Sequence, residues 1–248
     1  MNHLVLLAGG IGQRVGAGIP KQFVEVLGRP VIAYTLDIFE KHAEIDDILI
    51  VCHRDWRSFL DALIAKNGYD KVVKVVDGGH DFQHSMINGM KGLDGIAAAD
   101  DVVITHWAAS PFVTEDVISD NIRVCREKGN AMSACPFFLI VGSNDGDHSS
   151  KWVDRDSIIQ LNAPQSFRYS LYRDFYTKAE SEGLISQVEP HTTTLMYKMG
   201  IPIYYSKGNQ LNIKITTQED LVLFEGYLIA AQKRSGKMQR VVNARKEI

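Results

Sequence analysis

This sequence has few cysteines and lacks the features of a signal peptide. Each of these absences excludes a class of protein. Only three cysteines occur among 248 residues, at positions 52, 125 and 135, and none forms a CxxC pair. This spacing predicts buried thiols in a reducing compartment, so we expect neither a disulfide framework nor a zinc site. The N-terminal apolar run covers only Leu4-Val5-Leu6-Leu7 and follows no basic start, which argues against a signal peptide. We therefore expect a cytoplasmic protein.

The net charge is small, and long hydrophobic runs are absent from the sequence. The chain has 27 Lys+Arg against 30 Asp+Glu, a net charge of −3, whereas nucleic-acid binders are usually basic. No apolar run approaches the roughly 20 residues of a membrane span, so we expect neither a nucleic-acid nor a membrane partner. With 45% hydrophobic and 23% charged residues, the composition is that of a globular protein. A small anionic ligand is not excluded, because a few well-placed cations are enough to bind one.

What the chain does have is a regular alternation of short apolar runs and amphipathic stretches. Strand-like runs at 3–7, 47–52, 71–76 and 101–105 alternate with helical patterns at 30–42, 55–66, 83–93 and 114–128. The alternation predicts an α/β fold with a mostly parallel, Rossmann-like sheet flanked by helices. Ligands bind at the carboxyl ends of the strands in such sheets. The loops at 9–12, 78–85 and 106–111 should therefore share one rim.

The alternation changes near Pro136. The polar, glycine-bearing stretch at 142–150 predicts a hairpin tip, and with it a projecting β-arm at about 136–155. The apolar face of such an arm often needs a partner, so we expect a homodimer; a surface loop is the alternative. The sheet should resume with strands at 201–205 and 212–215. Thr216-Thr217 followed by Glu219-Asp220 predicts the start of a final helix, and the absence of a linker predicts one domain over 1–248.

The most informative motif is the glycine-rich turn after the first strand. It reads Leu7-Ala8-Gly9-Gly10-Ile11-Gly12-Gln13-Arg14 and is followed by Pro20-Lys21-Gln22-Phe23. Glycines there let backbone N–H groups approach phosphate oxygens without a Cβ in the way. The turn is not a dinucleotide fingerprint, because Val15 replaces the third glycine, and it is not a Walker loop. Arg14 and Lys21 stand where cations can neutralise a triphosphate and the charge developing at its α-phosphorus.

This AGGxGxR…PKQF string resembles the cytidylyltransferases of the 2-C-methyl-D-erythritol 4-phosphate and ribitol 5-phosphate type. Further matching segments occur in the family's order: Gly78-Gly79…Ser85, Thr105-His106…Pro111-Phe112, Pro164-Gln165-Ser166-Phe167 and Asn212-Ile213-Lys214. The resemblance covers essentially the whole chain. It implies a nucleotidyltransferase fold, a homodimer with an exchanged arm, and transfer of CMP from CTP to a small polyol phosphate with release of diphosphate.

The resemblance also implies roles for individual residues. Arg14 and Lys21 match the pair that stabilises the transition state, while Arg155 and Lys214 match residues that bind and position the acceptor. Nucleotide contacts are implied for Leu7, Ala8, Gly9, Gly10, Gly12, Gly79, His80, Ser85 and Ala108. The implied mechanism is direct in-line attack by an acceptor phosphate oxygen on the α-phosphorus, without a covalent enzyme intermediate.

Several positions depart from the family's pattern, and three of them replace a charged residue. Trp107 stands where the family has an aspartate that binds Mg²⁺, Ser110 replaces an arginine, and Phe82 replaces another. An indole cannot supply the hard oxygen ligand that Mg²⁺ prefers. The Mg²⁺ that the family implies is then held by triphosphate and water, or another carboxylate such as Asp77 or Asp81 helps, or catalysis is impaired.

The acceptor and the metal ligands stay open at this stage. The LAGG, THxAxxPF and PQSF strings favour the ribitol 5-phosphate branch, hence precursors of cell-surface polysaccharides. The 2-C-methyl-D-erythritol 4-phosphate enzyme of isoprenoid synthesis is one alternative, and a catalytically weakened nucleotide-binding homologue is another. His80 and His84 have a spacing that can ligate a metal, although Phe82 and the loop context argue against one there.

Overall fold

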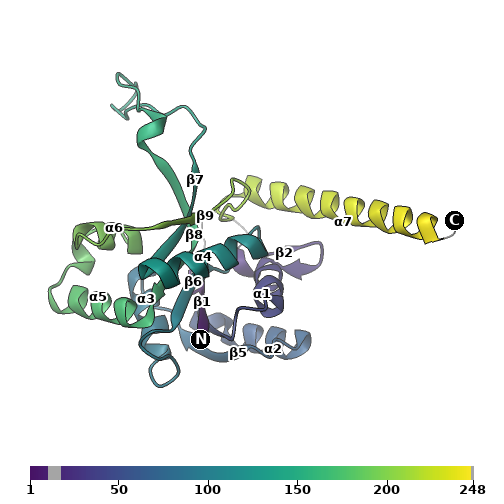
Figure 1. Ribbon diagram of the computed structural model, residues 1–248, viewed down its shortest axis with the longest axis horizontal. Coiled ribbons are helices and arrows are strands. Elements are labelled where there is room, and N and C mark those ends of the chain that lie inside the picture. The colour runs from purple at the N-terminus through teal and green to yellow at the C-terminus, as the bar shows by residue number, and fades with distance from the viewer. Residues whose placement is uncertain (11–17, 247–248) are drawn as a thin grey trace.

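A seven-stranded sheet in the order β5-β4-β1-β6-β8-β7-β9 forms the centre of the molecule (Figure 1). This computed structural model describes the chain over residues 1–10 and 18–246, with side chains up to residue 234. The strands are β1 (Asn2–Ala8), β4 (Asp47–Cys52), β5 (Val72–Asp77), β6 (Val102–Trp107), β7 (Asn130–Pro136), β8 (Ile159–Arg168) and β9 (Tyr205–Lys207). Neighbouring strands run parallel except where β8 pairs with β6 and β7. The expected α/β fold with a mostly parallel sheet is confirmed.

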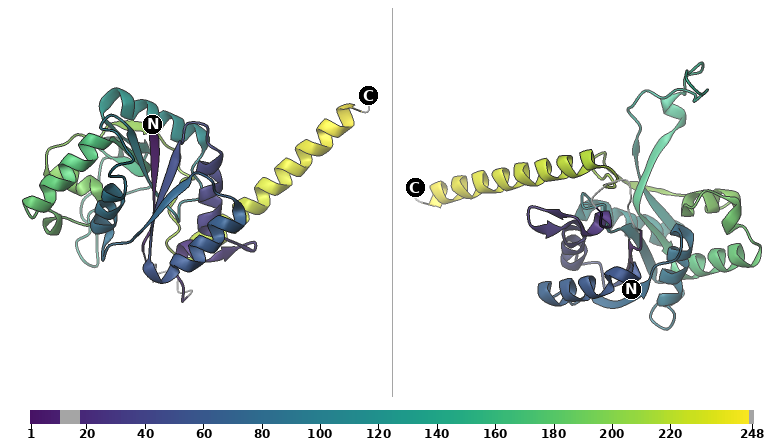
Figure 2. Two further views of the ribbon diagram at one scale, coloured as in Figure 1. Left: turned by 90° about the horizontal axis from the view of Figure 1, so that it is seen from below. Right: turned by 180° about the vertical axis from the view of Figure 1, so that it is seen from behind.

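Helices cover both faces of this sheet (Figure 2). One face carries α1 (Val31–Lys41), α2 (Arg57–Asn67) and α4 (Glu115–Lys128), and the other carries α3 (Phe82–Gly92), α5 (Tyr169–Ser181) and α6 (Thr192–Lys198). The side chains of β1 alternate between the two cores, with Leu4 and Leu6 in the first and Val5 in the second. Because both faces are buried, the strand reads as an unbroken apolar run. The three cysteines are buried and free, as expected.

Several boundaries follow from local signals in the sequence. Gly68 ends α2 and Gly129 ends α4, both with left-handed backbone, at φ 65° and 91°. The final helix, α7 (Gln218–Lys246), begins where Asp220 accepts hydrogen bonds from the backbone N–H groups of Thr216 and Thr217, at 2.7 and 3.0 Å. It extends away from the sheet in Figure 1. A small hairpin of β2 (Glu25–Val26) and β3 (Arg29–Pro30) packs near its first turns. No described helix is long and apolar enough to cross a membrane.

The expectation of a strand at 212–215 is wrong. Residues 212–215, all within the described part of the chain, are irregular. The strand expected at 201–205 lies instead at Tyr205–Lys207, the short β9. Asn212 is fully buried; its side-chain amide donates to the Ala163 carbonyl at 2.5 Å, and its own carbonyl accepts from Asn162. These side-chain bonds fix the segment in place without a strand ladder.

The segment between β7 and β8 projects away from the sheet where the arm was expected (Figure 1). The β7–β8 ladder ends at Pro136–Ile159, and farther out the segments are joined by a bridge between Gly142 and Trp152. The arm exposes large apolar side chains, among them Ile140 at 95% and Trp152 at 80%. Its role in a dimer stays a prediction, as does the assignment of one domain to 1–248.

Candidate active site

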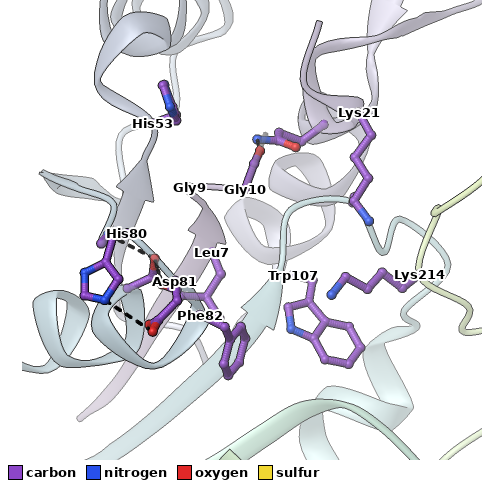
Figure 3. A pocket seen from close by; sticks show the side chains of 14 residues that line it. Leu7, Gly9, Gly10, Lys21, His53, His80, Asp81, Phe82, Trp107 and Lys214 are labelled. Carbon is purple, nitrogen blue, oxygen red and sulfur yellow. Dashed lines mark hydrogen bonds and ion pairs between the residues drawn. The ribbon is translucent and has the colours of Figure 1, made fainter. Parts of the chain in front are cut away.

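A pocket of about 430 Å³ opens at the edge of the sheet where β1, β4, β5 and β6 end (Figure 3). All four strands are parallel, so their carboxyl ends meet at this edge. The pocket is lined by Leu7, Gly9, Gly10, Lys21, Gln22, His53, Gly79, His80, Asp81, Phe82, Ser85, Trp107, Ala109 and Lys214. Residues from all three of the expected loops therefore share one rim, as the alternation predicted.

Two glycine loops meet across the top of β4. A Cβ on Gly78 would lie 3.0 Å from the Cα of Gly9, and a Cβ on Gly9 would lie 3.2 Å from the Cα of Gly78. Such distances are tighter than most real Cβ contacts, so a side chain at either position would have to push the loops after β1 and β5 slightly apart, which favours glycine at both. The pocket floor is consequently backbone rather than side chain.

The buried side chain of Gln22 ties the first glycine loop to the segment that carries Lys21. Its amide donates to the carbonyls of Ala8 at 2.7 Å and Gly10 at 2.8 Å. Lys21 and Gln22 belong to the same single turn of 3-10 helix, Lys21–Phe23, so these bonds also hold the backbone of Lys21 beside the loop. The sequence reasoning did not single out Gln22, although its place in the PKQF string was the available signal.

One side of the pocket, which we call the lysine side, consists of Lys21, Trp107 and Lys214. Figure 3 shows both lysine side chains on the same side of the pocket as the indole. The Lys214 Nζ lies 4.2 Å from the centroid of the Trp107 ring, a cation–π contact. The backbone beside Lys214 is fixed because the N–H of Ile215 donates to the carbonyl of Ala109 at 2.8 Å.

Behind Trp107, a buried histidine holds the loop that follows β6. Burial lowers the pKa of His106 to about 4, so its imidazole is neutral at pH 7. Its Nε2 therefore carries the proton and donates to the Ser110 carbonyl at 2.9 Å. Ser110 is itself fully buried, and its hydroxyl has no hydrogen-bond partner among the described residues. Position 110 thus points into the protein in this chain and presents no charge to the pocket.

The opposite side, which we call the histidine side, consists of His53, His80 and Asp81. Asp81 caps α3, accepting from the backbone N–H of His84 at 2.8 Å and from the His84 ring Nδ1 at 2.7 Å. Partial burial would raise the pKa of Asp81, but the hydrogen bonds from His84 and the nearby imidazole charges outweigh it and hold the pKa below its usual value. His53, which sequence reasoning missed, follows β4 directly, so the rim rule could have found it.

The structure brings most of the predicted site residues together. Lys21, Lys214, Leu7, Gly9, Gly10, Gly79, His80 and Ser85 all line the pocket. Ala8 and Ala108 do not: both are buried beneath it, with the Ala108 carbonyl bound to the Thr35 hydroxyl at 2.9 Å. Gly12 and Arg14 lie outside the described residues.

Arg155 is the predicted site residue that lies apart from the pocket. It is on the arm, where its Nη1 donates to the Phe138 carbonyl at 3.0 Å. Together with Ile140 and Trp152, it lines a separate hollow of about 320 Å³. Within one chain, the arm and the pocket do not meet.

The donor groups at the pocket do not suit a protein-bound Mg²⁺ at position 107, because Trp107 offers an indole there. Of the two other carboxylates considered, Asp77 lies outside the pocket lining and pairs with Arg54 at 2.9 Å. Asp81 is the one carboxylate among the described lining residues, and histidine nitrogens stand against both its oxygens. Magnesium itself stays a prediction.

Comparison with known proteins identifies the chain's relatives. The model of the 2-C-methyl-D-erythritol 4-phosphate cytidylyltransferase family matches residues 2–230. The chain belongs to this family. A ribitol-5-phosphate cytidylyltransferase of Lacticaseibacillus paracasei is 36% identical over 225 residues, which cover 90% of this chain and 96% of that protein. A 2-C-methyl-D-erythritol 4-phosphate cytidylyltransferase of Geobacter metallireducens is 32% identical over 222 residues, covering 89% and 94%.

A solved structure of the family agrees with the fold. The 4-diphosphocytidyl-2C-methyl-D-erythritol synthase of Anaerococcus prevotii has a TM-score of 0.76 and 27% identity, covering 92% of this chain and 98% of that one. The family resemblance stated from the motifs is therefore confirmed. The chain is a nucleotidyltransferase of the cytidylyltransferase type.

Proposed function

We propose that the chain transfers CMP from CTP to the phosphate of a small polyol phosphate such as ribitol 5-phosphate, for cell-surface polysaccharide precursors. The observation that carries the proposal is the arrangement of the lysine side across from a glycine-lined floor. Lys21 and Lys214 both line one pocket that also contains Gly9, Gly10 and Gly79. Backbone N–H groups next to glycine can donate to phosphate oxygens at close range, and the two lysines supply the opposing charge.

The proposed step is a single in-line displacement. An acceptor phosphate oxygen forms a bond to the α-phosphorus, while the bond from that phosphorus to the oxygen bridging to the β-phosphate breaks, and diphosphate leaves with the electron pair. The protein supplies no covalent group; Lys21 neutralises charge on the equatorial oxygens, and Lys214 orients the acceptor phosphate.

The choice of ribitol 5-phosphate rests on the relatives. Proteins named as ribitol-5-phosphate cytidylyltransferases are 36% identical to this chain, and those named as 2-C-methyl-D-erythritol 4-phosphate cytidylyltransferases reach 34%. The difference is small, so 2-C-methyl-D-erythritol 4-phosphate is the second acceptor to test. Trp107 favours a further candidate, a weakened nucleotide-binding homologue, because it replaces a carboxylate with a ring that covers Lys214.

We propose in addition that the enzyme acts as a homodimer in which the arm of one copy reaches the pocket of the other. Arg155 carries this proposal, since the resemblance gives it an acceptor-binding role while its own chain keeps it apart from the pocket. The exposed apolar arm side chains supply a surface for such an exchange. A cytoplasmic location stays a prediction.

Diphosphate release tests the proposal directly. The purified enzyme is assayed with each of four nucleoside triphosphates, with and without divalent cations, against ribitol 5-phosphate, 2-C-methyl-D-erythritol 4-phosphate and other polyol phosphates. Turnover with CTP and ribitol 5-phosphate supports the proposal, and turnover restricted to the erythritol acceptor replaces it. CTP binding by calorimetry without turnover for any pair would leave the weakened homologue as the function.

A further inference from the structure

The histidine side and the first turn of α3 together contain a cluster of metal-ligating side chains, of which His80 is also an implied nucleotide contact. We propose that His80, Asp81 and His84 bind a divalent transition-metal ion, with Zn²⁺ the best match to their donors. Each residue offers one ligand atom, and the three atoms lie within 4.8 Å of one another. Figure 3 shows His80 next to Asp81 at the edge of the pocket.

One separation in the cluster matches a metal site. The Nε2 of His80 lies 3.4 Å from Oδ2 of Asp81. Ligands bound at roughly 2.0–2.2 Å around a tetrahedral ion stand about 3.3–3.6 Å apart. The imidazole rings of His80 and His84 are also close, with centroids 3.7 Å apart and planes tilted by 39°. An ion that takes Nδ1 of His84 as a ligand would replace the hydrogen bond from this atom to Oδ1 of Asp81, now 2.7 Å long.

Helix capping alone does not account for this arrangement. Capping uses Oδ1 of Asp81, which faces the backbone N–H and ring of His84, whereas Oδ2 faces His80. It requires neither imidazole. The loop is instead compressed: a Cβ on Gly79 would lie 2.4 Å from the Cβ of His84, so glycine is required for this approach. The compression holds His84 beside the residues that precede α3.

The donor types select the class of ion. Two imidazole nitrogens and one carboxylate suit Zn²⁺ and its transition-metal neighbours, whereas Mg²⁺ prefers oxygen ligands alone. Three protein ligands leave a fourth position open, and His80 and Asp81 both line the pocket. An anion in the pocket, such as a phosphate oxygen of the nucleotide, completes the coordination; only this last step rests on the proposed function.

Cobalt provides the test, because Co²⁺ replaces Zn²⁺ and its visible absorption reports tetrahedral ligation. The full chain without a polyhistidine tag is titrated with Co²⁺ and, by calorimetry, with Zn²⁺, in the absence of nucleotide. We expect one ion per chain. His80→Ala and Asp81→Asn should each weaken the affinity at least about ten-fold, since removal of even an outer contact has this effect. The three cysteines are buried and offer no competing site.

The control is His148→Ala, which removes a histidine that also pairs with an aspartate, Asp147 at 2.9 Å, but lies on the arm. Its metal affinity should equal that of the unaltered chain. Asp81→Asn keeps an oxygen to cap α3, and unchanged circular dichroism verifies folding. Absence of stoichiometric binding, or equal loss in His148→Ala, would overturn the proposal. A Co²⁺ spectrum that CTP leaves unchanged would overturn only the completion of the coordination by an anion.

Discussion

The lysine side and the histidine side of the pocket are assembled in different ways. Lys21, Trp107 and Lys214 come from three distant parts of the chain and meet only because the sheet and the irregular segment at 212–215 place them together. His80 and Asp81 are neighbours in sequence, and their geometry is set by one loop and the first turn of α3. The lysine side therefore depends on the whole fold, whereas the His80–Asp81 part of the histidine side depends on local backbone.

The histidines near the two sides also differ, in burial and in what they contact. His106 stands behind the lysine side, fully buried and neutral, and holds the loop through the Ser110 carbonyl. His80 stands on the histidine side with 73% of its side chain exposed, against a carboxylate. One histidine is buried and supports a loop, while the other is exposed at the rim of the pocket. Substitutions should accordingly alter turnover on the lysine side, and metal binding and loop geometry on the histidine side.

The largest effect is expected from the lysine side, in Lys21→Ala. Loss of a charge that stabilises the transition state lowers kcat about 10²–10³-fold. The measurement is diphosphate release at saturating CTP. Lys91→Ala is the matched control, because Lys91 pairs with Glu180 at 3.3 Å on the surface and lies outside the pocket lining. Near-normal turnover in Lys21→Ala would remove this lysine from the mechanism.

On the histidine side, Gly79→Ala should damage the loop rather than the charge. The new Cβ would meet the Cβ of His84 at 2.4 Å, and relief of such overpacking costs about 1–3 kcal/mol. Urea unfolding measures the loss. Gly226→Ala is the control: it lies in α7 with open space around the Cβ, so stability should not fall. Equal stability of the two variants would show that the loop around Gly79 can shift to make room for a Cβ at little cost in free energy.

Acidification should lower the stability of the fold through His106, the buried histidine behind the lysine side. The folded-state pKa of His106, about 4, lies below its unfolded value of 6.5, so the unfolded chain binds a proton first as the pH falls. Stability is thus present above pH 6.5 and is lost as the pH falls toward 4, by about 2 kcal/mol between pH 7 and 4.5.

Urea unfolding of His106→Leu at both pH values isolates this contribution. The variant loses the bond to Ser110 at every pH, but its acid-induced loss of stability should be smaller by the same amount. His148→Ala, which changes an exposed histidine, should keep the full loss. An identical pH dependence in His106→Leu and the unaltered chain would mean that His106 titrates normally.

The alternation of strands and helices up to α4 was predictable because β1, β4, β5 and β6 follow one another in the expected rhythm, each with a helix after it; the short β2–β3 hairpin was not predicted. The rule that parallel strands end at one edge then placed the three loops correctly. β8 escaped prediction because polar residues fill its buried positions, among them Asn162, Gln165 and Ser166. A strand with such residues lacks the apolar pattern on which prediction depends.

Contacts between side chains and distant backbone were the part that sequence could not supply. Gln22 supports the glycine loop through two carbonyls, and Asn212 replaces a strand ladder with bonds to Asn162 and Ala163. Both are buried polar residues within matching motifs, but a motif does not say which backbone groups its side chains will bind. The ring of Trp107 was noted as a departure, but its contact with Lys214 appears only in three dimensions.

The contact between Trp107 and Lys214 leads to the prediction with the smallest expected effect, a change in the binding of the acceptor. If the indole face positions Lys214, Trp107→Leu should raise the KM for the polyol phosphate by roughly five-fold, the equivalent of about 1 kcal/mol for a cation–π contact. The KM for CTP and the melting temperature should change little. Steady-state kinetics with each substrate varied in turn separate these effects.

Trp107→Phe decides whether the ring itself is responsible. It keeps an aromatic face beside Lys214, so its acceptor KM should fall between those of Trp107→Leu and the unaltered chain. An equal rise in both variants would mean that side-chain volume, not the ring face, matters at position 107. A fall in kcat with unchanged acceptor KM would instead mean that the indole helps to stabilise the transition state. Trp107 would then act together with Lys21, the other residue of the lysine side to which we assign that role.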